Sequence, residues 1–204
     1  MNRKGRFLIL IISMIMLFIS GSNAYGREDI EDYIKEYKSS IYHMSKMIRC
    51  IPKSGDLNLD YLYEIAMLSE GEIEFSKAYV NHANCYKVKG VAEGYIERET
   101  SYINNIKSVI ENLKDNVEKN EELEEKYLEV FDINLNKMID DFQKVEISEN
   151  IDDNFLSFIS IHHNGIIDIT EEFLKLSDNK EVRDIANKVS NDMKNDLKVI
   201  KEVL

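Results

Sequence analysis

Apolar residues recur along most of the chain at spacings of three and four, with charged residues between them. This period places the apolar side chains on one face of an α-helix. The pattern predicts six amphipathic helices, which span residues 28–50, 58–82, 86–112, 122–146, 152–176 and 180–203. The chain contains one proline and eight glycines, a composition that disfavours a turn-rich all-β domain. The sequence therefore predicts an all-α protein.

The helical pattern repeats at an offset of 94 residues without a gap. At this offset apolar faces coincide with apolar faces and loops with loops, and Gly71, for example, aligns with Gly165. This agreement predicts two tandem three-helix units, at residues 28–112 and 122–204. Each unit is expected to form a small antiparallel bundle that packs against the other.

The first 24 residues differ in composition from the rest of the chain. A basic stretch, residues 1–6, is followed by an apolar run of 14 residues, 7–20, and then by small residues. This layout is typical of a secretory signal peptide, and the run is shorter than the ~20 residues of a membrane-spanning helix. We therefore expect residues 1–24 to be a signal peptide and the protein to be secreted or extracytoplasmic. An uncleaved N-terminal anchor is the alternative.

The net charge limits the partners that the protein can bind. Acidic residues outnumber basic residues by 38 to 26, which gives a net charge of −12. Because nucleic-acid binding requires a positive surface, we expect no nucleic-acid partner. We also expect no membrane partner beyond an uncleaved N-terminal anchor.

The sequence lacks the motifs of the enzyme classes that a helical bundle would suggest. No histidine is preceded by a glutamate three residues earlier, so the Glu-x-x-His ligands of di-iron bundles are missing. The two cysteines, Cys50 and Cys85, show no neighbouring base that would activate a thiol. The second predicted helix separates them by about 36 Å, so they are not expected to form a disulfide with each other. We expect the protein not to be an enzyme.

The fifth predicted helix carries the strongest chemical signal, the pair His162 and His163. Each histidine lies in a line of apolar residues at helical spacing, so both imidazoles are expected to face the core. Two methionines lie as far from the adjoining turns as the histidines do: 12 residues for Met138 and His162, and 15 for His163 and Met193. Equal distance from a turn means equal height in antiparallel helices, so these four side chains are predicted to form one layer.

Thioether and imidazole donors suit Cu(I) or Ag(I), so this layer is the candidate metal site. The first unit keeps a single soft donor at the matching positions, which hold Met44, Leu68, Ser69 and Glu99. We therefore expect one site per chain, in the second unit. The structural alternative is that the methionines fill the core and the histidines bridge buried polar groups.

The segment ISIHHNGIIDITEEFLKLSDNKEVRDIANKVSNDMKNDLKVI resembles the ferritin-like helical family known as domain of unknown function 305. The hallmark of that family is a His-His pair followed by small and apolar residues, a capping turn and a second amphipathic helix. The resemblance covers residues 155–203 well and residues 61–110 weakly, as a less preserved copy. It implies a ferritin-like bundle.

Some members of this family are exported copper- or silver-binding proteins that use histidine and methionine. The resemblance therefore implies His162 and His163 as ligand positions. The chain departs from the family pattern at Ile169 and Ile200, where methionines are expected, and at Met193, where a glutamine is expected. These departures leave fewer soft donors than the family pattern contains.

Two hypotheses for the function follow from the sequence. In the first, an exported helical bundle binds or buffers a soft metal ion through Met138, His162, His163 and Met193. In the second, a non-enzymatic envelope or secreted module binds an unknown protein partner, and its histidine pair is purely structural. Metal-induced thermal stabilisation distinguishes them, because an ion that binds the native state raises the melting temperature.

Overall fold

The computed structural model describes residues 29–115, 117 and 119–203, and these residues form helices with no strand. The first helix covers residues 29–48. The others are α2 (Leu57–His82), α3 (Tyr86–Leu113), α4 (Glu121–Lys144), α5 (Ile151–Leu176) and α6 (Lys180–Val203). The prediction of an all-α fold is confirmed. The predicted signal peptide, residues 1–24, lies outside the described residues, and no helix within them is long and apolar enough to cross a membrane.

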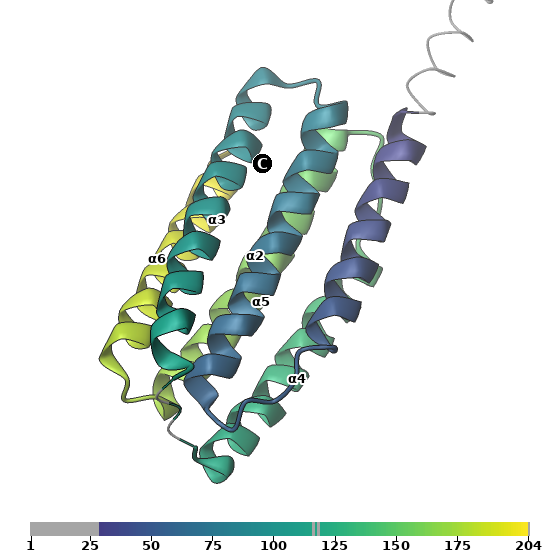
Figure 1. Ribbon diagram of the computed structural model, residues 1–204. Coiled ribbons are helices and arrows are strands. Elements are labelled where there is room, and N and C mark those ends of the chain that lie inside the picture. Colours follow the sequence, from purple (N-terminus) through teal and green to yellow (C-terminus); the bar gives the residue numbers. More distant parts are fainter. Residues whose placement is uncertain (1–28, 116, 118, 204) are drawn as a thin grey trace, which may run out of the picture.

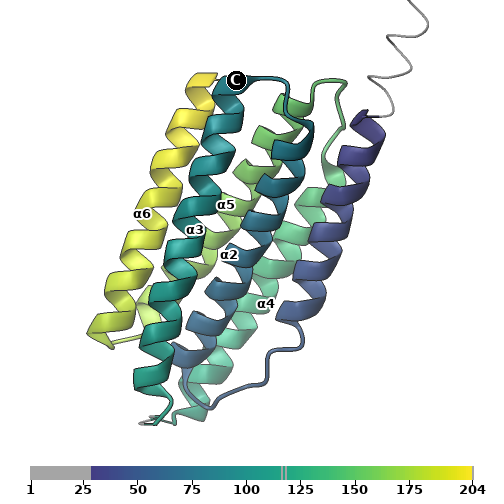
Figure 2. The same ribbon diagram turned by 45° about the horizontal axis from the view of Figure 1, so that its top comes forward.

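The helices pack in two layers (Figures 1 and 2). The first helix, α2 and α3 form one layer, and α4, α5 and α6 form the other. Consecutive helices run in opposite directions, and α2 and α5 occupy the middle of their layers. Contacts between α2 and α5 join the two layers, so residues about 90 positions apart in the sequence meet at the centre of the molecule.

Stacked aromatic rings make much of the contact between α2 and α5. Tyr61 stacks on Phe173 with ring centroids 3.8 Å apart, and Tyr79 stacks on Phe155 at 4.2 Å. At an offset of 94 residues, each of these pairs maps onto the other. All four side chains are buried, and they anchor both ends of the central helix pair.

Two of the loops between helices are built alike. Ser54 N donates to Asp60 Oδ1 and Ser148 N donates to Asn154 Oδ1, both at 2.9 Å. The helices that follow these loops, α2 and α5, begin 94 residues apart. These local contacts agree with the predicted offset, while the superposition of the two whole units stays a prediction.

Close helix packing depends on two glycines. A Cβ atom added at Gly71 would lie 2.4 Å from Met44 Sδ, and one added at Gly165 would lie 2.5 Å from Met138 Sδ. Both separations are far below van der Waals contact. Glycine therefore allows the methionines of the first helix and α4 to pack directly against the backbones of α2 and α5.

The antiparallel arrangement separates the two cysteines. Cys50 follows the first helix and is exposed, whereas Cys85 precedes α3 and is partly buried. They lie on either side of α2, and both are free thiols. The prediction that they form no disulfide is confirmed.

Candidate functional site

A buried group of metal-ligating side chains lies between α2 and α5. It consists of Glu72 of α2 and His162 and His163 of α5, all with 0% exposure. Each residue offers one ligand atom, and these atoms lie within 4.8 Å of one another. His163 Nε2 is 3.1 Å from Glu72 Oε1, and His162 Nδ1 is 3.3 Å from Glu72 Oε2. One carboxylate thus contacts both imidazoles.

Aromatic rings surround the two imidazoles. The Phe75 ring packs edge-to-face on His162 and the Tyr95 ring packs on His163, both with centroids 5.4 Å apart. Phe75 lies one helical turn after Glu72 on α2, and Tyr95 belongs to α3. These apolar walls keep water away and strengthen the electrostatic interactions inside the group.

Arg98 of α3 connects the group to two further carboxylates. Its Nη2 lies 3.2 Å from Glu72 Oε1, its Nε lies 2.8 Å from Glu99 Oε1, and its Nη1 lies 2.5 Å from Asp196 Oδ2. Asp196 lies on α6, and its Oδ2 is also 3.9 Å from His163 Nδ1. The polar network therefore spans α2, α3, α5 and α6.

The surroundings shift the pKa values of these groups in different directions. Burial opposes ionisation of Glu72, but the adjacent His163 and His162 more than offset it and hold the Glu72 pKa well below its usual range. Burial lowers the pKa of His162 despite the nearby Glu72 carboxylate. Burial, together with the negative charge of Glu72, raises the pKa of Glu99 to about 8. The site thus favours the ionised form of Glu72 and opposes the charged forms of His162 and Glu99.

Several ligand atoms of the group make no hydrogen bond of good geometry within the described residues. They are Glu72 Oε2, both ring nitrogens of His162, and His163 Nδ1. His162 is nonetheless close to two acceptors: its Nδ1 lies 3.3 Å from Glu72 Oε2, and the backbone of Leu68 also interacts with the ring, so both oppose the lowering of its pKa by burial. Buried polar atoms without partners are rare in folded proteins. Their convergence at one point fits the donor set of a bound cation.

The structure brings together part of the predicted layer. His162 and His163 are buried and adjacent, as the sequence predicts, and Met138 and Met193 are buried too, with 2% and 0% exposure. Met138 Sδ packs against Gly165 of α5. Among the described residues, neither methionine sulfur forms a hydrogen bond with an imidazole, and the side chain that contacts both imidazoles is Glu72. The four-residue layer therefore stays a prediction.

Sequence reasoning missed Glu72 and Arg98. Both are charged residues on helices of the first unit, where no site was expected. One signal was available for Glu72: at the 94-residue offset it aligns with Ile166, a core position. A carboxylate at a position that is apolar in the matching helix indicates a buried polar partner.

The fold and the site define an all-helical bundle with a buried Glu/His/His group. A family model described as Domain of unknown function (DUF305) matches residues 59–204, which include most of α2 and all of α3 to α6. The match covers well over half of the 204 residues, and the chain belongs to this family. Neither the curated proteins nor the solved structures contain a match. The ferritin-like architecture and the tandem duplication stay predictions.

Proposed function

We propose that this protein binds one transition-metal ion through Glu72, His162 and His163. The observation that carries the proposal is the convergence of three fully buried ligand residues, several of whose donor atoms make no hydrogen bond of good geometry. A proton on one imidazole could also balance the Glu72 charge, but it would occupy only one of these atoms. A metal ion would engage donors of all three residues together.

We propose copper as the ion, with silver as its redox-stable analogue. Imidazole is a good ligand for copper, while the carboxylate of Glu72 also suits harder divalent ions such as Zn(II). If Met138 or Met193 joins the group, its thioether shifts the preference toward Cu(I) or Ag(I). The predicted N-terminal signal peptide supports a role outside the cytoplasmic membrane, where the protein would bind or buffer the ion.

The test is a titration of the purified, metal-free protein with Ag(I), Cu(I) and Zn(II), followed by thermal unfolding. Free ion at 100 times its dissociation constant should stabilise the native state by ~2.7 kcal/mol. For a chain of this length, that corresponds to a rise of roughly 5–10 °C in the melting temperature. An unchanged melting temperature with all three ions would overturn the proposal.

Substitutions then assign the ligands. The double variant His162→Gln/His163→Gln and the single variant Glu72→Gln should each abolish the stabilisation and keep the helical circular dichroism spectrum. Met44→Leu is the matched control, because Met44 is a buried methionine of the first unit and should not affect binding. Loss of Ag(I) binding but not Zn(II) binding in Met138→Leu would support the soft-metal layer. If the histidine variant unfolds and the unmodified protein binds no ion, the histidine pair is structural.

A further inference from the structure

The ligand atoms of the group have no direct access to solvent. Glu72, His162 and His163 are completely buried, so an ion must pass a neighbouring side chain to reach them. Within the described network, Arg98 and Asp196 are the members with partly exposed side chains, at 22% and 18%. Both lie on the side of the group that faces α3 and α6.

We propose that the Arg98–Asp196 ion pair is the access gate of the site, and that Asp196 is an additional ligand that passes the ion to His163. This inference rests on the proposed metal binding. Asp196 Oδ2 lies 3.9 Å from His163 Nδ1, an imidazole atom that makes no hydrogen bond. The Asp196 carboxylate therefore lies between the partly exposed surface and the buried donors.

The contacts of Arg98 hold the proposed gate closed. A single guanidinium contacts carboxylates from three helices, Glu72 of α2, Glu99 of α3 and Asp196 of α6. While it does so, it neutralises the charges that would attract a cation, and it holds α3 against α6. The guanidinium also lies over the ring of Tyr95, 4.9 Å from its centroid, which orients the side chain.

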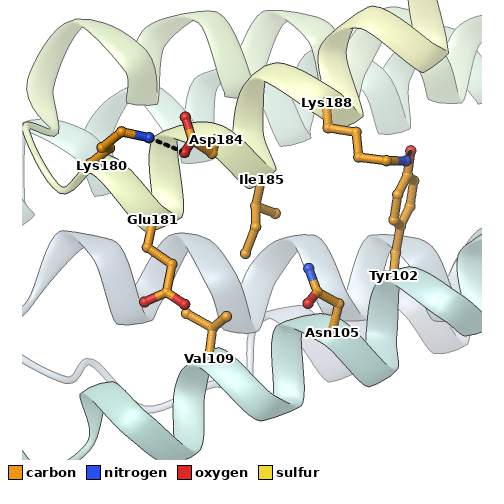
Figure 3. A pocket seen from close by; sticks show the side chains of 8 residues that line it. All are labelled: Tyr102, Asn105, Val109, Lys180, Glu181, Asp184, Ile185 and Lys188. Carbon is orange, nitrogen blue, oxygen red and sulfur yellow. Dashed lines mark hydrogen bonds and ion pairs between the residues drawn. The ribbon is translucent and has the colours of Figure 1, made fainter.

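α3 and α6 lie side by side at the edge of the two layers but are not in close contact along their length. The two helices approach each other less closely than α2 and α3 or α5 and α6 do. A pocket of about 500 Å³ opens between them near the start of α6, and Tyr102 and Lys188 line one end of it (Figure 3). Tyr102 lies one helical turn from Arg98, so the pocket ends one turn from the gate.

A second ion pair on α6 provides a matched control. Asp192 lies one turn before Asp196 on α6, and it pairs with Lys188 at 2.9 Å and accepts a hydrogen bond from Tyr102. It interacts electrostatically with Arg98, as Asp196 does, but it belongs neither to the buried Glu/His/His group nor to an ion pair with Arg98. Asp192→Asn should leave access to the histidines unchanged, whereas changes at Arg98 or Asp196 should alter it.

The first readout needs no metal. The purified protein is treated with diethyl pyrocarbonate, and modification of His162 and His163 is followed by mass spectrometry, with exposed His43 as the internal reference. Breaking one charge-assisted hydrogen bond should favour the open gate by about tenfold or more. Arg98→Met should increase the modification rate of the buried pair by that factor, relative to His43. If Arg98→Met unfolds, Arg98→Lys tests the gate instead, because lysine keeps the positive charge but cannot contact three carboxylates as the planar guanidinium does.

The second readout separates the gate from the ligand. The protein is loaded with Cu(I), and transfer of copper to an excess of a chromogenic chelator is timed. Arg98→Lys should speed release by about tenfold. Asp196→Asn should open the gate to diethyl pyrocarbonate and also weaken copper binding, because it removes a ligand.

The outcomes distinguish failure of the gate from failure of the proposed function. If the unmodified protein binds no copper, both proposals are wrong. If it binds copper but the Arg98, Asp196 and Asp192 variants do not differ in histidine modification or copper release, the gate is wrong and the metal site stands. Faster modification with unchanged copper affinity in Asp196→Asn would retain the gate and exclude Asp196 as a ligand.

Discussion

Replacing Asp60 with asparagine should stabilise the protein near neutral pH and leave its stability near pH 4 unchanged. Asp60 lies in the first turn of α2 with 1% exposure. Its Oδ1 accepts a hydrogen bond from Ser54 N, and its carboxylate also faces that of Glu124 on α4. Glu124 in turn accepts a hydrogen bond from Gly55 N at 2.8 Å. Two buried acids therefore bind the same loop, and neither carboxylate forms an ion pair with a base in the part of the chain that the structure describes.

The size of the effect follows from the pKa of Asp60. Burial, followed by the interaction with Glu124, raises this pKa from 3.8 to about 6. The folded state thus holds the proton more tightly than the unfolded chain, and stability is lost as the pH rises from about 4 through 6. A shift of about 2 units corresponds to ~3 kcal/mol at higher pH. Asparagine cannot ionise, so Asp60→Asn should avoid this loss.

The second unit already contains the substituted arrangement. Asn154, which aligns with Asp60 at the 94-residue offset, accepts from Ser148 N and donates from its Nδ2 to Ser148 O, both at 2.9 Å. Asparagine therefore fits this loop geometry, and its amide at position 60 could donate to Glu124. The reciprocal variant, Asn154→Asp, replaces the donor with an acid and should destabilise the protein near neutral pH.

The assay is urea unfolding followed by far-ultraviolet circular dichroism at about pH 4 and about pH 7.5. With an m-value of ~2–3 kcal/mol/M, Asp60→Asn should raise the midpoint at the higher pH by about 1 M. At the lower pH the two proteins should unfold at similar urea concentrations. An equal shift at both pH values, or a lower midpoint for the variant at pH 7.5, would refute the assignment of a raised pKa to Asp60.

Three other predictions concern the core and the thiols. Gly165→Ala should lower the free energy of unfolding by about 1–3 kcal/mol, because the added Cβ would overlap the Met138 sulfur. Gly94→Ala should raise it by about 0.5–1 kcal/mol, because no atom lies within 4 Å of the added Cβ. Thermal unfolding of the two variants measures both changes. Burial raises the pKa of Glu64 to about 8, so its ionisation lowers the stability of the folded state as the pH rises above about 4.5. In urea unfolding, Glu64→Gln should therefore raise the free energy of unfolding by roughly 3–4 kcal/mol near pH 7.5 and leave it unchanged near pH 4. Without reductant, both Cys50 and Cys85 should react with an alkylating reagent, and Cys50 should react faster because it is exposed. A protein mass two hydrogens lower than that of the free-thiol form would show a disulfide and contradict this prediction.

The sequence alone determined the helices and the burial of the histidine pair. The predicted helix over residues 152–176 corresponds to α5, and the one over 86–112 corresponds to α3, each within one residue at either end. Helix boundaries depend on local features, namely the apolar period and the polar residues that cap or interrupt it. The burial of His162 and His163 depends on the same period, because both lie in apolar lines of one helix.

Only the tertiary structure decided which groups the histidines meet. The height of a residue along a bundle follows from its distance to the nearest turn in the sequence. This distance predicts that Met138 and Met193 lie level with the histidines. The packing of one layer on the other cannot be counted in this way, because it depends on side-chain fit between helices far apart in the sequence. Glu72 lies 91 residues from His163, and it reaches the pair only because α2 packs across α5. Local periodicity carries no information about that contact, so the carboxylate at the centre of the site emerged only from the folded chain.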